Sequence, residues 1–284
     1  MKQYIEIPER WEELSSKQFK YLLKAVFLMI ANTGITSEDI LRDFSDYLLG
    51  RKKYIHPMRK EKYLILIHET AKKLCWIFTI VDEMLQFNFE TTKNLLPRLE
   101  KLSGPQSHGS DFRFGEFRMA VEYYNRFTQN HKKQDLDALV GILYRKPNKK
   151  KIDEKFDGNY RRPFNKHLIG KYASRVKSFP EYIKWGVYVW FGYFCKYMME
   201  GTFIIEGNEV CFAPVFKRES SDPDEKKENS IGMAAVLFTL ADAGTFGNAK
   251  ETDETELYKV LLKLLHDNNI LEEIKKNDPG KTSA

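Results

Sequence analysis

The chain has 284 residues and a net charge of +6, and 42% of its residues are hydrophobic and 14% aromatic. This much apolar material excludes disorder of the whole chain and suffices for one large domain or two closely packed ones. Cys75, Cys195 and Cys211 are too few and too far apart for a disulfide framework or a zinc cluster, which predicts free thiols and a cytoplasmic protein.

The N-terminus is predicted to be a short extended arm followed by helices. It is charged and has no apolar run, so no signal peptide is expected. Trp11 and Leu14 are expected to anchor the arm. Ser15 or Ser16 is the predicted N-cap of a first helix, because a hydroxyl there accepts a bond from an orphan backbone N–H, and the stretch Thr36-Ser37-Glu38-Asp39 is expected to cap a second.

A long helix is predicted over residues 62–87, and its broadly apolar composition favours a central position. A loop rich in serine, glycine and proline follows at 103–111. We therefore expect an N-terminal helical region over 1–105 and a C-terminal helical region over 106–284, or one continuous domain.

The most informative stretch is 112–147, FRFGEFRMAVEYYNRFTQNHKKQDLDALVGILYRKP. Apolar residues recur at helical spacing in both halves, which predicts two antiparallel helices joined by about six polar residues. Asp135 is the predicted N-cap of the second helix.

The basic segment, residues 145–166, contains nine basic and three acidic residues and so carries +6, the net charge of the whole chain. Two prolines and an Asp-Gly pair predict a loop. Its interpretations are a solvated loop, a surface for an acidic protein, or a nucleic-acid surface with stacking aromatics. The candidate partner-binding residues are Arg145, Lys149, Lys150, Lys151, Tyr160, Arg161 and Arg162.

The C-terminal half is predicted to be mainly helical with one β-hairpin. After a modest helix at 165–177, the aromatic stretch 181–200 is expected to be a buried core helix, because its apolar run is too short and too charged to span a membrane. Gly207-Asn208 between two apolar runs predicts the hairpin, near 202–216. Residues 217–230 are predicted to be a mobile loop.

Two further helices complete the predicted C-terminus. One is expected at 231–241, followed by a glycine-rich turn at 242–248. The last is expected to start at Thr252 or Thr255, and residues 277–284 are predicted to be a frayed tail.

No local motif predicts catalysis, a cofactor or a metal. The six histidines form no HExxH-type pair and none lies near a cysteine. The stretch GTFGNAK at 244–250 lacks the spacing of a phosphate-binding loop, and no GxSxG is present. We therefore expect a protein that is not an enzyme and uses no cofactor, although distant residues could still converge into an active site.

Several segments resemble an uncharacterised family encoded in prophage-like and mobile elements of Bacteroidetes, near phage tail genes, where tail assembly chaperones are found. The segments that carry the resemblance are IPERWEELSSKQFKYL, RFGEFRMAVEYYNRF, DLDALVGILYRKP, WGVYVWFGYFCKYMMEGTFIIEGNEVCF and TLADAGTFGNAKETDETELYKVLLKLL. They are packing and turn motifs, and the resemblance implies a role in phage structure or assembly without assigning a site residue.

The sequence therefore predicts a mainly α, bundle-like fold with a small β-hairpin. The leading functional hypothesis is a non-enzymatic phage or prophage protein that binds another protein, as a tail assembly chaperone or tail accessory, with a tape-measure-like protein as one suspected partner. The alternative is a nucleic-acid-binding accessory protein that uses the basic segment. No membrane partner is expected.

Overall fold

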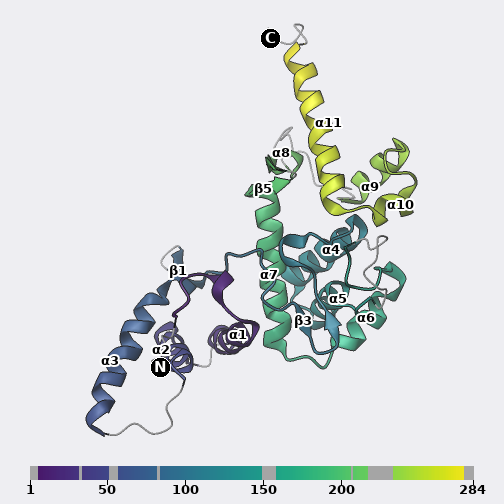
Figure 1. The fold of residues 1–284 in the computed structure, drawn as a ribbon. Coiled ribbons are helices and arrows are strands. Elements are labelled where there is room, and N and C mark those ends of the chain that lie inside the picture. Colours follow the sequence, from purple (N-terminus) through teal and green to yellow (C-terminus); the bar gives the residue numbers. More distant parts are fainter. Residues whose placement is uncertain are drawn as a thin grey trace. The chain divides into compact units, whose positions relative to one another are not determined.

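The computed structural model describes residues 6–31, 34–50, 57–81, 84–148, 158–205, 207–216 and 233–277. The predicted fold class is confirmed: the chain is mainly α-helical, and its sheets are small antiparallel pairs (Figure 1). The chain divides into two compact units, each built from two stretches of sequence. Unit 1 is 1–97 with 178–193, and unit 2 is 98–177 with 194–284.

Unit 1 combines three helices, a hairpin and the first part of α7. Its elements are η1 (Trp11–Glu13), α1 (Ser16–Ile30), α2 (Ser37–Leu48), α3 (Pro57–Lys73), η2 (Cys75–Ile77), β1 (Phe78–Val81), β2 (Met84–Phe87) and the first part of α7 (Glu181–Glu200). Both predicted N-caps are confirmed. The Gln18 amide donates to the Ser15 hydroxyl while the Gln18 side chain accepts from the Ser15 amide at 2.8 Å, and Thr36 and Asp39 repeat this capping box.

The predicted anchor of the N-terminal arm is confirmed, because Trp11 and Leu14 are buried. The Trp11 ring lies edge-on to Trp76 and Phe87, with centroids 4.9 and 5.3 Å away, and its Nε1 donates to the Asn88 carbonyl at 2.9 Å. This aromatic cluster joins the arm to the β1–β2 hairpin.

The predicted long helix over 62–87 is wrong. Helix α3 ends at Lys73, and residues 78–81 and 84–87 form an antiparallel strand pair in which Phe78 is paired with Phe87 and Ile80 with Leu85. Residues 79–81 are β-branched and fit a strand better than a helix. Apolar spacing alone predicts a helix here, which is why the hairpin was not expected from the sequence.

Helix α3 is also not central in unit 1. It buries Ile67 and Thr70 on one face, together with Leu74 just beyond its end, and it packs on α2. Leu64, Ile65 and Leu66 are 52%, 55% and 48% exposed.

Unit 2 contains the predicted helix pair and the C-terminal helices. Its elements are β3 (Arg98–Leu99), β4 (Leu102–Ser103), η3 (Ser107–Gly109), α4 (Phe114–Asn130), α5 (Lys133–Leu143), η4 (Lys166–Leu168), α6 (Ile169–Val176), the end of α7, β5 (Thr202–Ile205), β6 (Asn208–Cys211), α8 (Ala213–Phe216), α9 (Met233–Asp242), α10 (Ala249–Glu254) and α11 (Leu257–Asn277). The β5–β6 pair confirms the predicted hairpin. The predicted loop at 217–230 and most of the predicted tail lie outside the described residues.

The α4–α5 connection is tighter than predicted. Only His131 and Lys132 separate the two helices, and His131 adopts a left-handed conformation with φ 52° that ends α4. The N-cap of α5 is Lys132. The prediction for Asp135 is therefore wrong: it lies inside the first turn and accepts a bond from the Asn130 side chain at 3.0 Å.

The last helix also begins later than predicted. Asn248 caps the short α10, Thr252 lies inside that helix, and α11 begins at Leu257. The Phe114 amide donates to the Thr255 carbonyl and the Leu257 amide donates to the Phe112 carbonyl, both at 2.9 Å. These two bonds fix the start of α11 against the start of α4.

Helix α7 contains a largely buried face along its whole length, as predicted for the aromatic stretch. Val187 and Phe191 in unit 1 and Phe194 and Met198 in unit 2 are 1% exposed or less. Among the described residues, no helix is both long enough and apolar enough to cross a membrane.

Candidate functional site

The two ends of the basic segment pair with each other through an antiparallel β-bridge between Pro147 and Arg161. The Asn148 amide donates to the Tyr160 carbonyl at 2.8 Å, and the Arg162 amide donates to the Lys146 carbonyl at 2.9 Å. On its other side, Arg145 exchanges backbone hydrogen bonds with Ser103 at 2.8 and 3.0 Å. The described ends of the predicted loop are thus held by backbone pairing.

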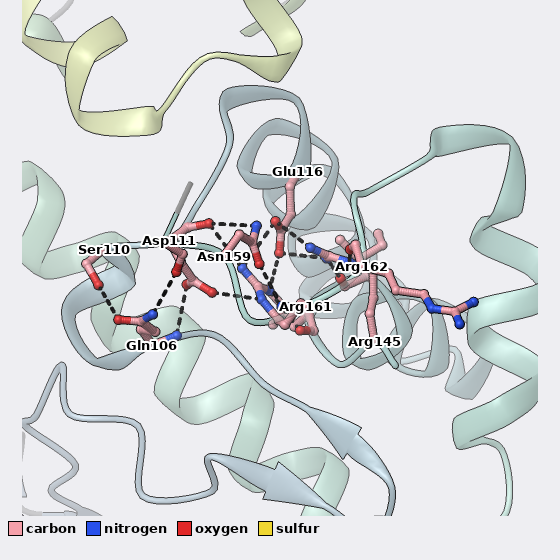
Figure 2. Close-up of polar contacts among 11 residues, drawn as sticks. Gln106, Ser110, Asp111, Glu116, Arg145, Asn159, Arg161 and Arg162 are labelled. Carbon is pink, nitrogen blue, oxygen red and sulfur yellow. Dashed lines mark hydrogen bonds and ion pairs between the residues drawn. The ribbon is translucent and has the colours of Figure 1, made fainter. Parts of the chain in front are cut away.

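Arg161 lies inside unit 2 with 0% of its surface exposed (Figure 2). Its Nε donates to Asp111 Oδ2 at 3.0 Å, and Nη1 and Nη2 donate to the two oxygens of Glu116. Nη1 also donates to the Leu143 carbonyl at 2.9 Å, and the guanidinium carbon lies 5.5 Å from the centre of the Phe112 ring. Each nitrogen of this guanidinium therefore has an internal acceptor.

Arg145 approaches the same carboxylate and is 1% exposed. Its Nη1 and Nη2 contact the two oxygens of Glu116 at 2.8 and 3.0 Å, and its Nε donates to the Arg162 carbonyl at 2.7 Å. Nη1 also donates to the Ile142 carbonyl, and the guanidinium carbon lies 5.8 Å from the centre of the Phe164 ring.

The two carboxylates come from the start of α4 and the loop before it. Glu116 is in the first turn of α4, where the helix dipole favours a negative charge. Asp111 accepts from the Gln106 amide at 2.9 Å, and its own carbonyl accepts from the Asn159 side chain at 3.3 Å. We call Asp111, Glu116, Arg145 and Arg161 the arginine network.

The arginine network carries two positive and two negative charges, so its formal charge is zero. Burial lowers the pKa of the Arg145 guanidinium, and the Glu116 carboxylate acts in the opposite direction. Arginine ordinarily titrates so far above neutral pH that Arg145 stays charged. Loss of one member would leave a buried charge uncompensated, which costs about 3–5 kcal/mol.

The structure separates the predicted partner-binding residues into three groups. Arg145 and Arg161 are buried and bound to internal carboxylates, so this structure does not present them to a partner. Tyr160, which is 50% exposed, and Arg162 lie on the surface. Lys149, Lys150 and Lys151 lie outside the described residues.

Asp111 and Glu116, the carboxylates that bind the two arginines, were not predicted as site residues from the sequence. Glu116 lies in the run FRFGEF, between aromatic residues that are themselves buried. A carboxylate that is buried among apolar residues in the first turn of a helix needs a charged partner. That pattern was visible in the sequence, but the partner's identity was not.

No group of three or more histidine, cysteine, aspartate or glutamate residues among the described residues could hold a metal ion. Burial raises the pKa of the Cys195 thiol, and a thiol that stays protonated is a poor nucleophile.

A shallow groove with a volume of about 610 Å³ lies on unit 2 between α4, α5 and the η4–α6 segment. We call it the α4–α6 groove. The residues that line it are Met119, Tyr123, Arg126, Gln134, Asp135, Ala138, Lys166, His167, Ile169, Gly170 and Ala173. Its floor is mainly apolar, and cationic side chains come from both α4 and η4.

Two glycines fit the shape of this region. A Cβ at Gly141 would lie 2.6 Å from the Tyr172 backbone, so glycine allows α5 and α6 to pack closely. A Cβ at Gly170 would meet nothing within 4 Å, so the groove is open there.

Comparisons with protein-family models, with curated proteins and with solved structures return no match.

Proposed function

We propose that this chain is a non-enzymatic phage or prophage protein that binds another protein during tail assembly in the bacterial cytoplasm. The observation that carries the proposal is the exposure of Leu64, Ile65 and Leu66 on α3 of unit 1. Exposed apolar residues that lie together are typical of surfaces that contact a partner.

The three leucine and isoleucine side chains project around α3 instead of forming one narrow stripe. Successive residues of an α-helix are rotated by about 100°, so Leu64, Ile65 and Leu66 span about 200° around one turn of α3. A partner that covers these three side chains would have to contact α3 on more than one side. That geometry suits an apolar helical partner better than a small ligand.

The β1–β2 hairpin of the same unit adds a second apolar surface. Ile80 and Leu85 are cross-strand neighbours on one face, and they are 73% and 45% exposed. Phe78 and Phe87 share that face. Phe87 packs on Trp11, so the apolar face of the hairpin begins in the aromatic cluster and continues to its exposed end.

The phage assignment rests on the sequence resemblance. The resembling segments fall on η1, the first half of α1, α4, α5, α7, the β5–β6 hairpin, the end of α9, α10 and the first part of α11. They do not include α3 or the β1–β2 hairpin.

The test is co-expression with the products of neighbouring tail genes, followed by co-purification. We expect one of them to bind the wild-type protein and to be lost from the double variant Leu64→Glu/Ile65→Glu. Phe238→Glu is the matched control, because Phe238 is 53% exposed and belongs to unit 2. Absence of any complex, or a complex that both variants retain equally, would contradict the proposal.

Nucleic-acid binding through the basic segment is the second candidate. It is favoured by residues 158–177, which contain no aspartate or glutamate and expose Arg162 and Lys166. Binding of this kind weakens steeply with salt. Replacing Lys149, Lys150, Lys151 and Arg162 with alanine should then remove salt-sensitive retention on single-stranded DNA or RNA, and no such retention by the wild type would exclude it.

A further inference from the structure

The η4–α6 segment is positively charged on its surface. Between residues 158 and 177 the chain has six lysines and arginines and no acidic residue. Arg161 is neutralised inside the arginine network, but Lys166, Lys171 and Lys177 are exposed. Positive charge is therefore concentrated on one short stretch that also forms an edge of the α4–α6 groove.

The exposed lysines of the η4–α6 segment lie on two sides of it, one at the groove and one away from it. Ile169, Gly170 and Ala173 line the groove with Lys166 and His167. Lys171 does not line it: at about 100° per residue, it projects from the opposite side of the helix from Ala173. Lys166 and Lys171 are thus a matched pair of exposed cations, one at the groove and one outside it.

The opposite wall is one face of α4. Met119, Tyr123 and Arg126 follow one another at i, i+4 and i+7, which places them in a row along the helix. The Arg126 guanidinium carbon lies 5.0 Å from the centre of the Tyr123 ring, and its Nη2 contacts Glu122 at 2.6 Å. Cations therefore border the apolar floor on both sides.

The floor comes from α5 and α6. Ala138, Ile169 and Ala173 are small or apolar, and the one carboxylate among the lining residues, Asp135, accepts a bond from Asn130 at 3.0 Å. The empty space above Gly170 leaves room for the backbone of a docked segment.

We propose that the α4–α6 groove binds an acidic, amphipathic helix of a partner protein. Apolar side chains spaced at i, i+3 or i+4 and i+7 would face Met119, Ile169 and Ala173. Glutamate or aspartate at the borders of that stripe would face Lys166, and also Arg126 in place of its surface contact with Glu122. With Asp135 counted, the lining residues carry one net positive charge, which disfavours a basic segment. Nucleic acid fits less well, because Tyr123 and the His167 imidazole are the two aromatic rings among the lining residues, too few to stack a run of bases.

The α4–α6 groove, like the surface of the proposed function, would bind a protein, but it contains no residue of α3 or of the β1–β2 hairpin. The two surfaces can therefore succeed or fail separately. Loss of the tail partner on substitution of Leu64 and Ile65 tests the first surface, and peptide binding to the α4–α6 groove tests the second.

The experiment is selection of a displayed library of random 16-residue peptides on the wild-type chain. Before the selection, peptides that bind the Gly170→Trp variant are removed from the library. In that variant the indole fills the groove at a position that is otherwise open. Selected peptides are synthesised with a fluorophore, and their dissociation constants are measured by anisotropy. We expect apolar residues at helical spacing and a clear excess of glutamate and aspartate.

Variants then locate the site. Lys166→Glu and Gly170→Trp should each weaken binding of a selected peptide by about tenfold or more. Lys171→Glu makes the same charge change outside the groove and should change the dissociation constant by less than about twofold. Circular dichroism checks that each variant is folded. If Gly170→Trp does not fold, Lys166→Glu alone provides the test.

Three results would overturn the inference. One is recovery of no binding peptide, and another is selection of peptides without an acidic bias. The third is a selected peptide whose affinity falls equally in Lys166→Glu and Lys171→Glu. A fluorescent oligo-dT that binds the wild type and is lost in Lys166→Glu, while no peptide is selected, would identify the surface as a nucleic-acid site instead.

Discussion

Arg161 and Arg162 are adjacent in the chain, yet one lies in the interior of unit 2 and the other on its surface. The pairing of the segment's two ends explains the difference, because successive side chains of an extended strand point to opposite sides. Arg145 and Lys146 on the facing strand alternate in the same way. The charge of the basic segment is therefore divided between a structural network and a surface, and only the surface part can recognise a partner.

The largest effect is expected when the shared carboxylate of the arginine network is removed. Glu116→Ala leaves the Arg145 and Arg161 guanidinium groups buried without their common partner, and it should lower the free energy of unfolding by about 3–5 kcal/mol. Glu122→Ala, which breaks a surface ion pair on the same helix, should cost less than about 1 kcal/mol. Urea denaturation measures both, and equal costs would mean that the network contributes no more than a surface pair.

A smaller effect is expected where two helices approach each other closely. Gly141→Ala places a methyl group against the Tyr172 backbone, and overpacking of this kind costs about 1–3 kcal/mol. That exceeds the gain in helix propensity of about 1 kcal/mol. Gly170→Ala faces open space and should be neutral or slightly stabilising, which thermal denaturation of both variants can check. A stable Gly141→Ala variant would show that α5 and α6 can move apart without cost.

The smallest effect concerns a carboxylate that caps a helix at the surface. Hydrogen bonds from the Thr36 side chain and backbone hold the pKa of Asp39 below its ordinary value. Its contribution to stability is therefore present above the ordinary aspartate pKa of about 3.9 and is lost as the pH falls through the lower folded-state pKa. Asp39→Asn does not titrate, so its melting temperature should lie below that of the wild type near neutral pH, and the gap should close in acid. A gap that does not change with pH would exclude this role for the Asp39 charge.

The sequence predicts those features that depend on a few neighbouring residues. The caps at Ser15 and Thr36 follow from residues three positions away, and the β5–β6 hairpin follows from its Gly-Asn turn. The β1–β2 hairpin was missed because short apolar runs fit both helix and strand, and the aromatic packing of Phe87 on Trp11 involves residues far apart in the chain.

The candidate site was less predictable because the deciding contacts are distant in sequence. Arg161 binds carboxylates 50 and 45 positions earlier, and no local pattern distinguishes it from Arg162. The α4–α6 groove likewise combines residues of α4, α5 and the η4–α6 segment, so the sequence predicted a basic segment but not that Arg126 and Lys166 line one groove.

The most direct measurement compares the unfolding free energies of Arg161→Ala and Arg162→Ala. If Arg161 neutralises Asp111 and Glu116 inside unit 2, its loss should cost about 3–5 kcal/mol. The same substitution at the exposed Arg162 should change stability by no more than about 0.5 kcal/mol. Equal and small losses for both variants would contradict the division of the basic segment into a structural network and a recognition surface.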